Sequence, residues 1–266
     1  MKGALAMALA LALAAGTALA APSNQLYLIK PDGNAAPLAR IVSGGFEYLS
    51  LGDEETGKPP RSLNVYLGAR HAGKVKVGTA EIPDGTGCSD GASLQLLPLA
   101  GGEVPGSGLA TVRPLILRPA RPEIALTSAE LQGLSQLAGT WMEKQGVKRK
   151  DRIAALKTLE ASAAGEVVAV SVNYDNGDAN QVVTLFFLAS KGAGGQFSMV
   201  YEESYVGAHG EGEQANKKYL EHLDLDADGV DEIVISDSAY ESWFYGILKR
   251  QGGKWTKVHT QDGGGC

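Results

Sequence analysis

The sequence predicts an all-β fold, made mainly of antiparallel sheets, with one bridging helix at about residues 127–145. The 266 residues include 35 glycines, which separate many short runs rich in Val, Ile, Leu and Tyr. This arrangement is typical of chains with many strands and turns. One segment combines a helix start signal with a helical apolar stripe. The 44% share of hydrophobic residues is enough for a packed core and argues against disorder.

Residues 1–20 have the organisation of a secretory signal peptide. Lys2 gives a positive charge, an apolar stretch follows at 4–15, and Ala18-Leu19-Ala20 has the small-x-small pattern of a cleavage site. We therefore expect cleavage between Ala20 and Ala21, with an uncleaved membrane anchor as the alternative. The expected product is secreted or periplasmic, with no membrane span after signal cleavage.

The charge balance excludes some classes of partner. The chain has 24 basic and 30 acidic residues, and residues 1–20 contain only Lys2, so the remainder has a net charge of −7. A nucleic-acid-binding protein needs a basic face, so we expect no nucleic-acid partner. The unassigned partner is a protein or a glycan, and the oligomeric state is open.

The N-terminal β-rich region covers residues 21–118. Seven short apolar runs predict strands here, at 26–30, 38–42, 46–51, 63–69, 74–82, 93–99 and 109–117. Pro-Asp-Gly at 31–33 and at 83–85 has turn chemistry. A Pro-containing linker follows at 119–126.

The predicted helix covers 127–146. Thr127-Ser-Ala-Glu130 matches a capping box, and apolar residues then fall on one helical stripe, which ends with Trp141 and Met142. Gly146 is suited to the left-handed stop position. We expect the stripe to be core packing, and the basic stretch 148–152 to be a solvated turn.

From 153 to 266 the sequence predicts strands again. Two strong strands at 167–174 and 181–189 flank Asp175-Asn-Gly-Asp, a hairpin signal. Further strands are expected at 197–205, 219–223, 233–236, 243–249 and 255–259. Gly252-Gly253 predicts the last hairpin turn.

Residues 224–232, Asp-Leu-Asp-Ala-Asp-Gly-Val-Asp-Glu, form a compact calcium-loop pattern. Carboxylates at loop positions 1, 3 and 5 can turn toward a common point, and glycine at position 6 permits the sharp turn around it. A hard cation would remove the repulsion among these carboxylates, and calcium tolerates irregular oxygen coordination better than magnesium. An exposed acidic turn without metal is the alternative.

This loop is not an EF-hand, because position 12 is Ile235 inside a β-branched run rather than a bidentate Glu before a helix. With a strand following, the loop resembles that of FG-GAP/VCBS-type repeats, the blades of integrin-like β-propellers. The resemblance covers about 218–260. Carried over by position, it implies calcium ligands at Asp224, Asp226, Asp228, Val230 (backbone carbonyl) and Glu232. The family has Asp where this chain has Glu232.

A shift of 64 residues superimposes Leu156, Leu159, Glu160 and Gly165 on Leu220, Leu223, Asp224 and Gly229. The interpretation is two blade-like repeats, at about 153–206 and 218–260, of which the first has lost its ligands.

Cys88 and Cys266 are the two cysteines. In an oxidising compartment an even count favours one disulfide, and two unpaired thiols in glycine-rich loops are the alternative.

Two patterns imitate functional motifs. Gly52 to Pro59 resembles a phosphate-binding loop, but its last position is Pro and its interior is acidic. His209-Gly-Glu211-Gly-Glu213 is more typical of an exposed loop than of a metal site. His71, His222 and His259 have no partners that the sequence can assign.

The sequence leaves the catalytic residues unknown, if there are any. Its leading functional interpretation is an exported, calcium-stabilised β protein that acts as a binding or envelope-associated module. The alternative is a secreted hydrolase whose catalytic groups meet only in the folded chain.

Overall fold

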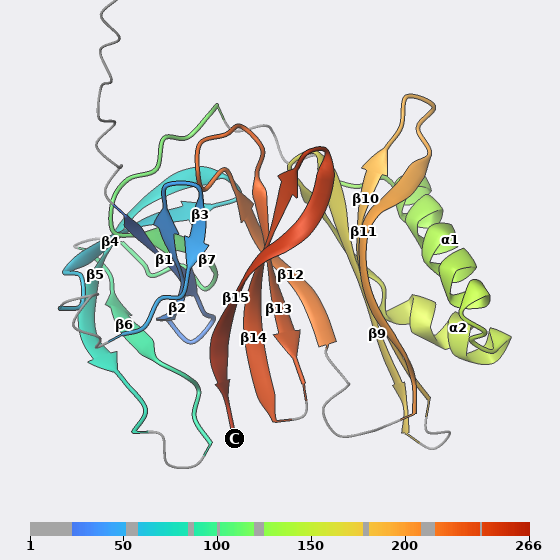
Figure 1. Ribbon diagram of the computed structural model, residues 1–266, viewed down its shortest axis with the longest axis horizontal. Coiled ribbons are helices and arrows are strands. Elements are labelled where there is room, and N and C mark those ends of the chain that lie inside the picture. The colour runs from blue at the N-terminus through green and yellow to red at the C-terminus, as the bar shows by residue number, and fades with distance from the viewer. Residues whose placement is uncertain are drawn as a thin grey trace, which may run out of the picture.

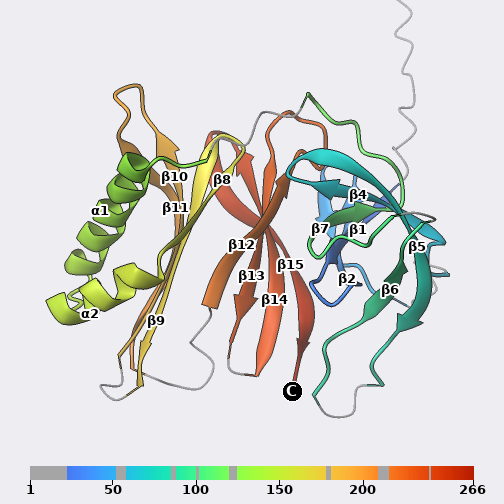
Figure 2. The same ribbon diagram turned by 180° about the vertical axis from the view of Figure 1, so that it is seen from behind.

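A computed structural model describes residues 23–51, 58–84, 88–99, 102–119, 125–177, 181–208, 216–239 and 241–266. The architecture is a succession of layers: a small barrel, two four-stranded sheets and a layer of helices. In Figure 1 the barrel lies on the left and the helices on the right, and Figure 2 shows the same succession from behind. The predicted all-β class is confirmed. The expected signal peptide, at 1–20, lies outside the described residues.

Six N-terminal strands close into a barrel. The order is β1-β7-β4-β5-β6-β2-β3, and β1 also pairs with β2, so the ring closes and β3 extends β2 outside it. Tyr27, Leu63 and Leu94 are fully buried in its interior. The strands are β1 (Asn24–Ile29), β2 (Asn34–Val42), β3 (Gly45–Glu47), β4 (Ser62–Leu67), β5 (Arg70–Glu81), β6 (Ser93–Leu97) and β7 (Gly108–Thr111).

Two antiparallel meanders follow in the chain, and in each the strands pair in sequence order. The first meander contains β8 (Glu160–Ala164), β9 (Val167–Asn176), β10 (Gln181–Lys191) and β11 (Phe197–Gly207). The second meander contains β12 (Asn216–Leu223), β13 (Glu232–Ser238), β14 (Ser242–Gln251) and β15 (Lys254–Gly265). The hairpin between β9 and β10 is the one that Asp175-Asn-Gly-Asp indicates.

The two meanders pack face to face, and each has a second covered face. Phe186 and Leu188 meet Ile233, Ile235 and Trp255 between them. The other face of the first meander packs on the helices, and that of the second packs on the barrel. Because both faces are covered, β10 is an almost continuous apolar run in place of an alternating one.

The main helix, α1 (Ser128–Lys144), begins at the predicted capping box, with both reciprocal hydrogen bonds between Thr127 and Glu130. The buried stripe is Leu134, Ala138, Trp141 and Met142, which packs on β9 and β10.

The structure also has a short second helix, α2 (Arg149–Ala155), and a 3-10 turn (Leu156–Thr158), where the sequence predicts a solvated turn and then strand. The reason is tertiary. Ala155 is fully buried, and the buried carboxylate of Asp151 accepts hydrogen bonds from Tyr174 and Asn176 of β9. Seven residues are too few to show a helical period in the sequence.

Candidate metal centre

The acidic loop joins β12 to β13 at the edge of the second meander. Leu223 and Glu232 pair across the base of this wide hairpin. Asp224 at the start and Glu232 at the end are 5% and 1% exposed. The middle of the loop is more accessible, so the site is a half-open cup with a buried base.

Backbone N–H groups hold the carboxylates inside the loop. Gly229 N donates to Asp224 Oδ2 at 3.0 Å, and Leu225 N donates to Glu232 Oε2 at 2.8 Å. The chain turns back sharply because Gly229 has a φ of +95° and Ala227 a φ of +62°. Glycine adopts such positive φ values without steric cost, which is why this loop needs it at position 229.

Three of the five expected ligands come together. One oxygen from each of Asp224, Asp226 and Glu232 lies within 4.8 Å of the other two. Asp228 is not a member of this triad, and its Oδ1 accepts a hydrogen bond from the backbone N–H of Val230, the fifth expected ligand, at 2.9 Å.

Two buried carboxylate oxygens of the triad lack a hydrogen bond: Asp224 Oδ1, and Glu232 Oε1, which lies 3.3 Å from the Lys249 ammonium. A buried acceptor such as Asp224 Oδ1 is rare in folded proteins because its desolvation is uncompensated. Burial raises the pKa of Glu232 to about 8 and also raises the pKa of Asp224. Hard oxygen donors with unfilled coordination are what a Ca²⁺ ion binds, so the residues fit this metal.

Two basic side chains, which the sequence analysis did not connect with the loop, also contact it. Lys249 of β14 is ion-paired with Asp226, and its Nζ lies 2.9 Å from Asp228 Oδ2 and 3.3 Å from Glu232 Oε1. Arg118 donates from Nη1 to Gly229 O at 3.0 Å, and its Nε is 3.7 Å from Asp224 Oδ2. Lys249 reaches the loop through the register of β13 and β14. Ile233 pairs with Leu248 in this antiparallel pair, so their neighbours Glu232 and Lys249 lie side by side.

Asp231 belongs to the loop by sequence but not to the triad. Its Oδ2 lies 3.7 Å from Nε2 of the buried His222, whose Nδ1 is 2.7 Å from Tyr219 Oη. Asp231 also lies against Gly165, the turn between β8 and β9. Asp231 therefore contacts β12 and the first meander, so a substitution at Asp231 is a control for substitutions in the triad.

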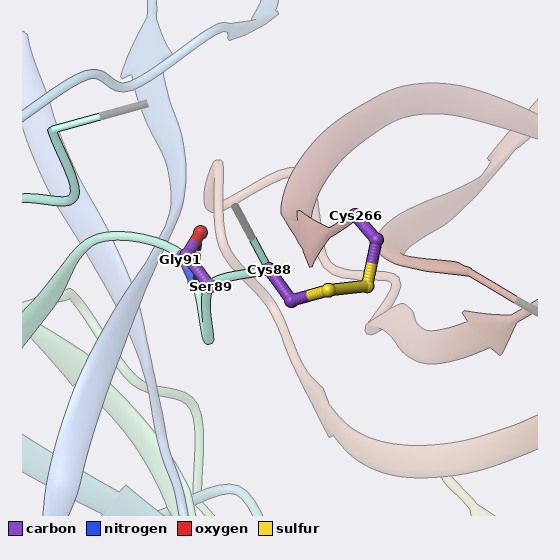
Figure 3. Close-up of a disulfide and its surroundings, with 4 residues drawn as sticks. All are labelled: Cys88, Ser89, Gly91 and Cys266. Carbon is purple, nitrogen blue, oxygen red and sulfur yellow. Dashed lines mark hydrogen bonds between the residues drawn. A yellow bond between two sulfur atoms is a disulfide. The ribbon is translucent and has the colours of Figure 1, made fainter. Parts of the chain in front are cut away.

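The disulfide between Cys88 and Cys266 is formed, as predicted, and spans 178 residues of sequence. Figure 3 shows it joining the segment after β5 to the end of β15. Ser89 and Gly265 exchange backbone hydrogen bonds of 3.0 and 3.1 Å beside it. Gln261 adds a second link to the barrel by exchanging two 3.0 Å hydrogen bonds with the backbone of Leu49.

A cavity of about 610 Å³ lies beside the disulfide, where the barrel meets the second meander. Tyr48, which is 57% exposed, is among its lining residues. Among the described residues, Glu241 and Asp262 are the acidic ones that line it, and no Lys, Arg or His does.

A charged network joins the two meanders through residues at the start of β12 and the end of β13. Lys217 and Lys257 pair with Glu203 and Asp237, and Lys217 Nζ lies 3.0 Å from Glu203 Oε2. Each charge in this cluster meets an opposite one. The network therefore stabilises the contact between the sheets, and its paired charges leave no free acid or base.

The remaining sequence candidates are structural or lie outside the described part. His259 Nε2 is 3.0 Å from Leu38 O, a contact between β15 and the barrel, and His71 stacks edge-on with Tyr66. The loop with His209, Glu211 and Glu213 falls outside the described residues, as does most of the imitation phosphate loop. Among the described helices, none combines the length and apolarity needed to cross a membrane.

Comparisons with known proteins add no relative: no protein-family model, curated protein or solved structure matches this chain. Functional inference therefore depends on the residues of the loop and on the cavity.

Proposed function

We propose that this protein is an exported, calcium-stabilised β protein that acts as a binding or envelope-associated module. In this proposal Ca²⁺ is a structural ligand of the loop between β12 and β13. The ligands are Asp224, Asp226 and Glu232 from the triad, with Asp228 and the Val230 carbonyl completing the set.

The observation that carries the calcium proposal is the pair of buried carboxylate oxygens without a hydrogen bond, Asp224 Oδ1 and Glu232 Oε1, of which the second lies 3.3 Å from Lys249 Nζ. A loop that only needed to turn would leave its carboxylates in water. Here the chain buries them at the base of a hairpin and holds them there with backbone N–H groups. The bound ion would compensate the desolvation of both groups and attach the two ends of the hairpin to each other.

Thermal denaturation with calcium and with chelator tests this proposal. Extracellular calcium modules have dissociation constants of about 10⁻⁴ to 10⁻³ M. At 10 mM Ca²⁺ the linkage relation then gives about 1.4 to 2.7 kcal/mol of stabilisation, or a rise in Tm of roughly 3–10 °C. Calorimetry should show a matching heat of binding.

Two variants and one matched control distinguish calcium binding at the triad from a general effect of negative charge in the loop. Asp224→Asn and Glu232→Gln should abolish the calcium-dependent rise in Tm. Asp231→Asn removes one negative charge from the same loop outside the triad and should keep the rise. Equal Tm in calcium and chelator for the wild type, with no heat of binding, would contradict the proposal.

Export is proposed from residues 1–20, and the Cys88–Cys266 bond is consistent with an oxidising compartment. N-terminal sequencing of the protein recovered from the periplasm or medium of its expression host should begin at Ala21. A product that retains Met1 and remains in the membrane fraction would contradict cleavage.

The binding role is assigned to the cavity beside the disulfide. Ligand sites favour junctions between structural units, and two covalent or hydrogen-bonded links already fix this junction. The exposed ring of Tyr48 offers an aromatic surface at its wall. A glycan array should give hits that Tyr48→Ala removes and that Leu131→Ala, a substitution at an exposed apolar residue of α1, retains.

A secreted hydrolase is the second candidate, and one observation favours it. Glu241 and Asp262 both line that cavity, and two carboxyl groups are the minimal equipment of a glycoside hydrolase. Nitrophenyl glycosides would serve as probes. If the protein hydrolyses a probe and Glu241→Gln or Asp262→Asn abolishes this activity, the protein is a hydrolase. If it binds glycans but hydrolyses no probe, the binding-module proposal is favoured.

A further inference from the structure

Lys249 contacts more of the expected calcium ligands than any other described side chain. Its ammonium pairs with Asp226, with Asp228 Oδ2 at 2.9 Å and with Glu232 Oε1 at 3.3 Å. Its side chain is only 12% exposed. Three ion pairs on one nearly buried ammonium distinguish this contact from a surface salt bridge.

The contacts of Lys249 overlap with the metal triad at Asp226 and Glu232. An ammonium that shares these carboxylates with a divalent cation would lie within a few ångströms of it, and like charges at that distance repel strongly in a partly buried site. The same oxygens therefore cannot hold both Lys249 and Ca²⁺ at full strength.

Arg118 makes a useful contrast, since it also approaches the loop. It contacts Gly229 O and Asp224 Oδ2, the oxygen that already accepts from Gly229 N. It is 61% exposed and contacts neither Asp224 Oδ1 nor Glu232 Oε1. Calcium can bind without moving this arginine.

We propose that Lys249 is the built-in counter-ion of the metal-free loop and that Ca²⁺ binds in exchange for its ammonium group. This inference rests on the proposed function, because it concerns the same loop. It explains how the three carboxylates of Asp226, Asp228 and Glu232 remain close together without metal. It also predicts that Lys249 weakens calcium binding and moves toward solvent when calcium binds. The path is short, because Arg250 and Gln251, which follow it on β14, are exposed.

Amine footprinting tests the exchange in the unmodified protein. N-hydroxysuccinimide acetate is applied in chelator and in calcium, and acetylation is read by mass spectrometry. Lys249 should be protected in chelator and should react at least threefold more in calcium. Lys254, exposed at the start of β15, should react equally in both. Calcium binding with no change at Lys249 would overturn the exchange.

Calorimetry of variants separates this inference from the proposed function. Lys249→Met should bind Ca²⁺ at least tenfold more tightly than the wild type, or about 1.4 kcal/mol. Lys254→Met, which makes the same change in net charge, should bind like the wild type. If Lys249→Met does not fold without metal, Lys249→Gln keeps a polar side chain and should show the same gain.

The outcomes are distinguishable. Binding by the wild type with no gain in the Lys249 variants overturns the exchange and leaves the calcium proposal. Binding by the variants alone supports Lys249 as the occupant of the loop and contradicts calcium as a ligand of the wild type. No binding by any form overturns both.

Discussion

Gly229 meets two physical requirements at one position. Its φ of +95° lies in the region that L-residues rarely adopt. A Cβ placed there would also overlap the guanidinium of Arg118. The glycine therefore lets the loop turn and lets Arg118 lie over the turn and donate to its carbonyl.

Gly229→Ala should accordingly destabilise the protein more than backbone strain alone predicts. Strain at positive φ costs about 1–2 kcal/mol, and displacement of Arg118 should add about 1 kcal/mol through its lost hydrogen bond. Gly253→Ala is the matched control, since Gly253 has a φ of +82° and open space around its Cβ position. Urea denaturation of both variants measures the difference.

In an Arg118→Ala background, Gly229→Ala and Gly253→Ala should lower the free energy of unfolding by equal amounts, because the contact between Arg118 and Gly229 is already absent. A larger loss at Gly229 that persists without Arg118 would show that the arginine is not its cause.

At the scale of elements, the start of α1 shows how one carboxylate can serve two structures. Glu130 Oε2 accepts from Thr127 N at 2.8 Å, which closes the capping box. Its Oε1 accepts from Lys191 Nζ at 2.7 Å, at the end of β10. The helix cap is thereby attached to the sheet on which the helix packs.

This arrangement predicts a specific acid dependence. The hydrogen bond from Lys191, followed by those from Thr127, lowers the pKa of Glu130 from 4.5 to about 2. A lowered pKa in the folded state means that its stabilisation is complete above about pH 4.5 and is lost as the pH falls toward 2. Glu130→Gln should therefore destabilise the protein at pH 7 and have little effect near pH 2.

Denaturation in urea at pH 7, 4 and 2.5 measures this difference. Glu143→Gln is the control, since Glu143 lies on the same helix in an exposed pair with Arg152. Its effect should stay small throughout, as is usual for exposed pairs. A Glu130→Gln effect that does not change with pH would exclude the charge as its source.

The elements also show what the sequence can predict and why. Short apolar runs predicted each strand of the barrel, and the capping box predicted the start of α1, because both signals are local. Closure of the barrel was not predictable, since it depends on Leu26 pairing with Ala39 on one side and Thr111 on the other. The acidic loop was readable from the spacing of its carboxylates, whereas Lys249 and Arg118 reach the loop only through the fold.

For the whole molecule, the layers depend on one another through a few long-range links. The second meander contributes to two apolar cores, one shared with the barrel and one with the first meander. Polar contacts reinforce both junctions: Gln261 to Leu49 on the barrel side, and the Lys217 network toward the first meander. The acidic loop belongs to this central sheet, so an ion bound there would stabilise the sheet on which both neighbours pack.

Removal of the disulfide should test how far the barrel junction depends on a covalent link. The bond closes a segment of 178 residues, and the chain-entropy relation then gives about 5 kcal/mol of stabilisation. Because this acts on the unfolded chain, Cys88→Ala with Cys266→Ala should lower the urea midpoint and raise the m-value, as a less compact unfolded state exposes more surface. Each single variant should lose as much as the double, since either one removes the bond. An unchanged midpoint and m-value in the double variant would contradict stabilisation through the unfolded chain.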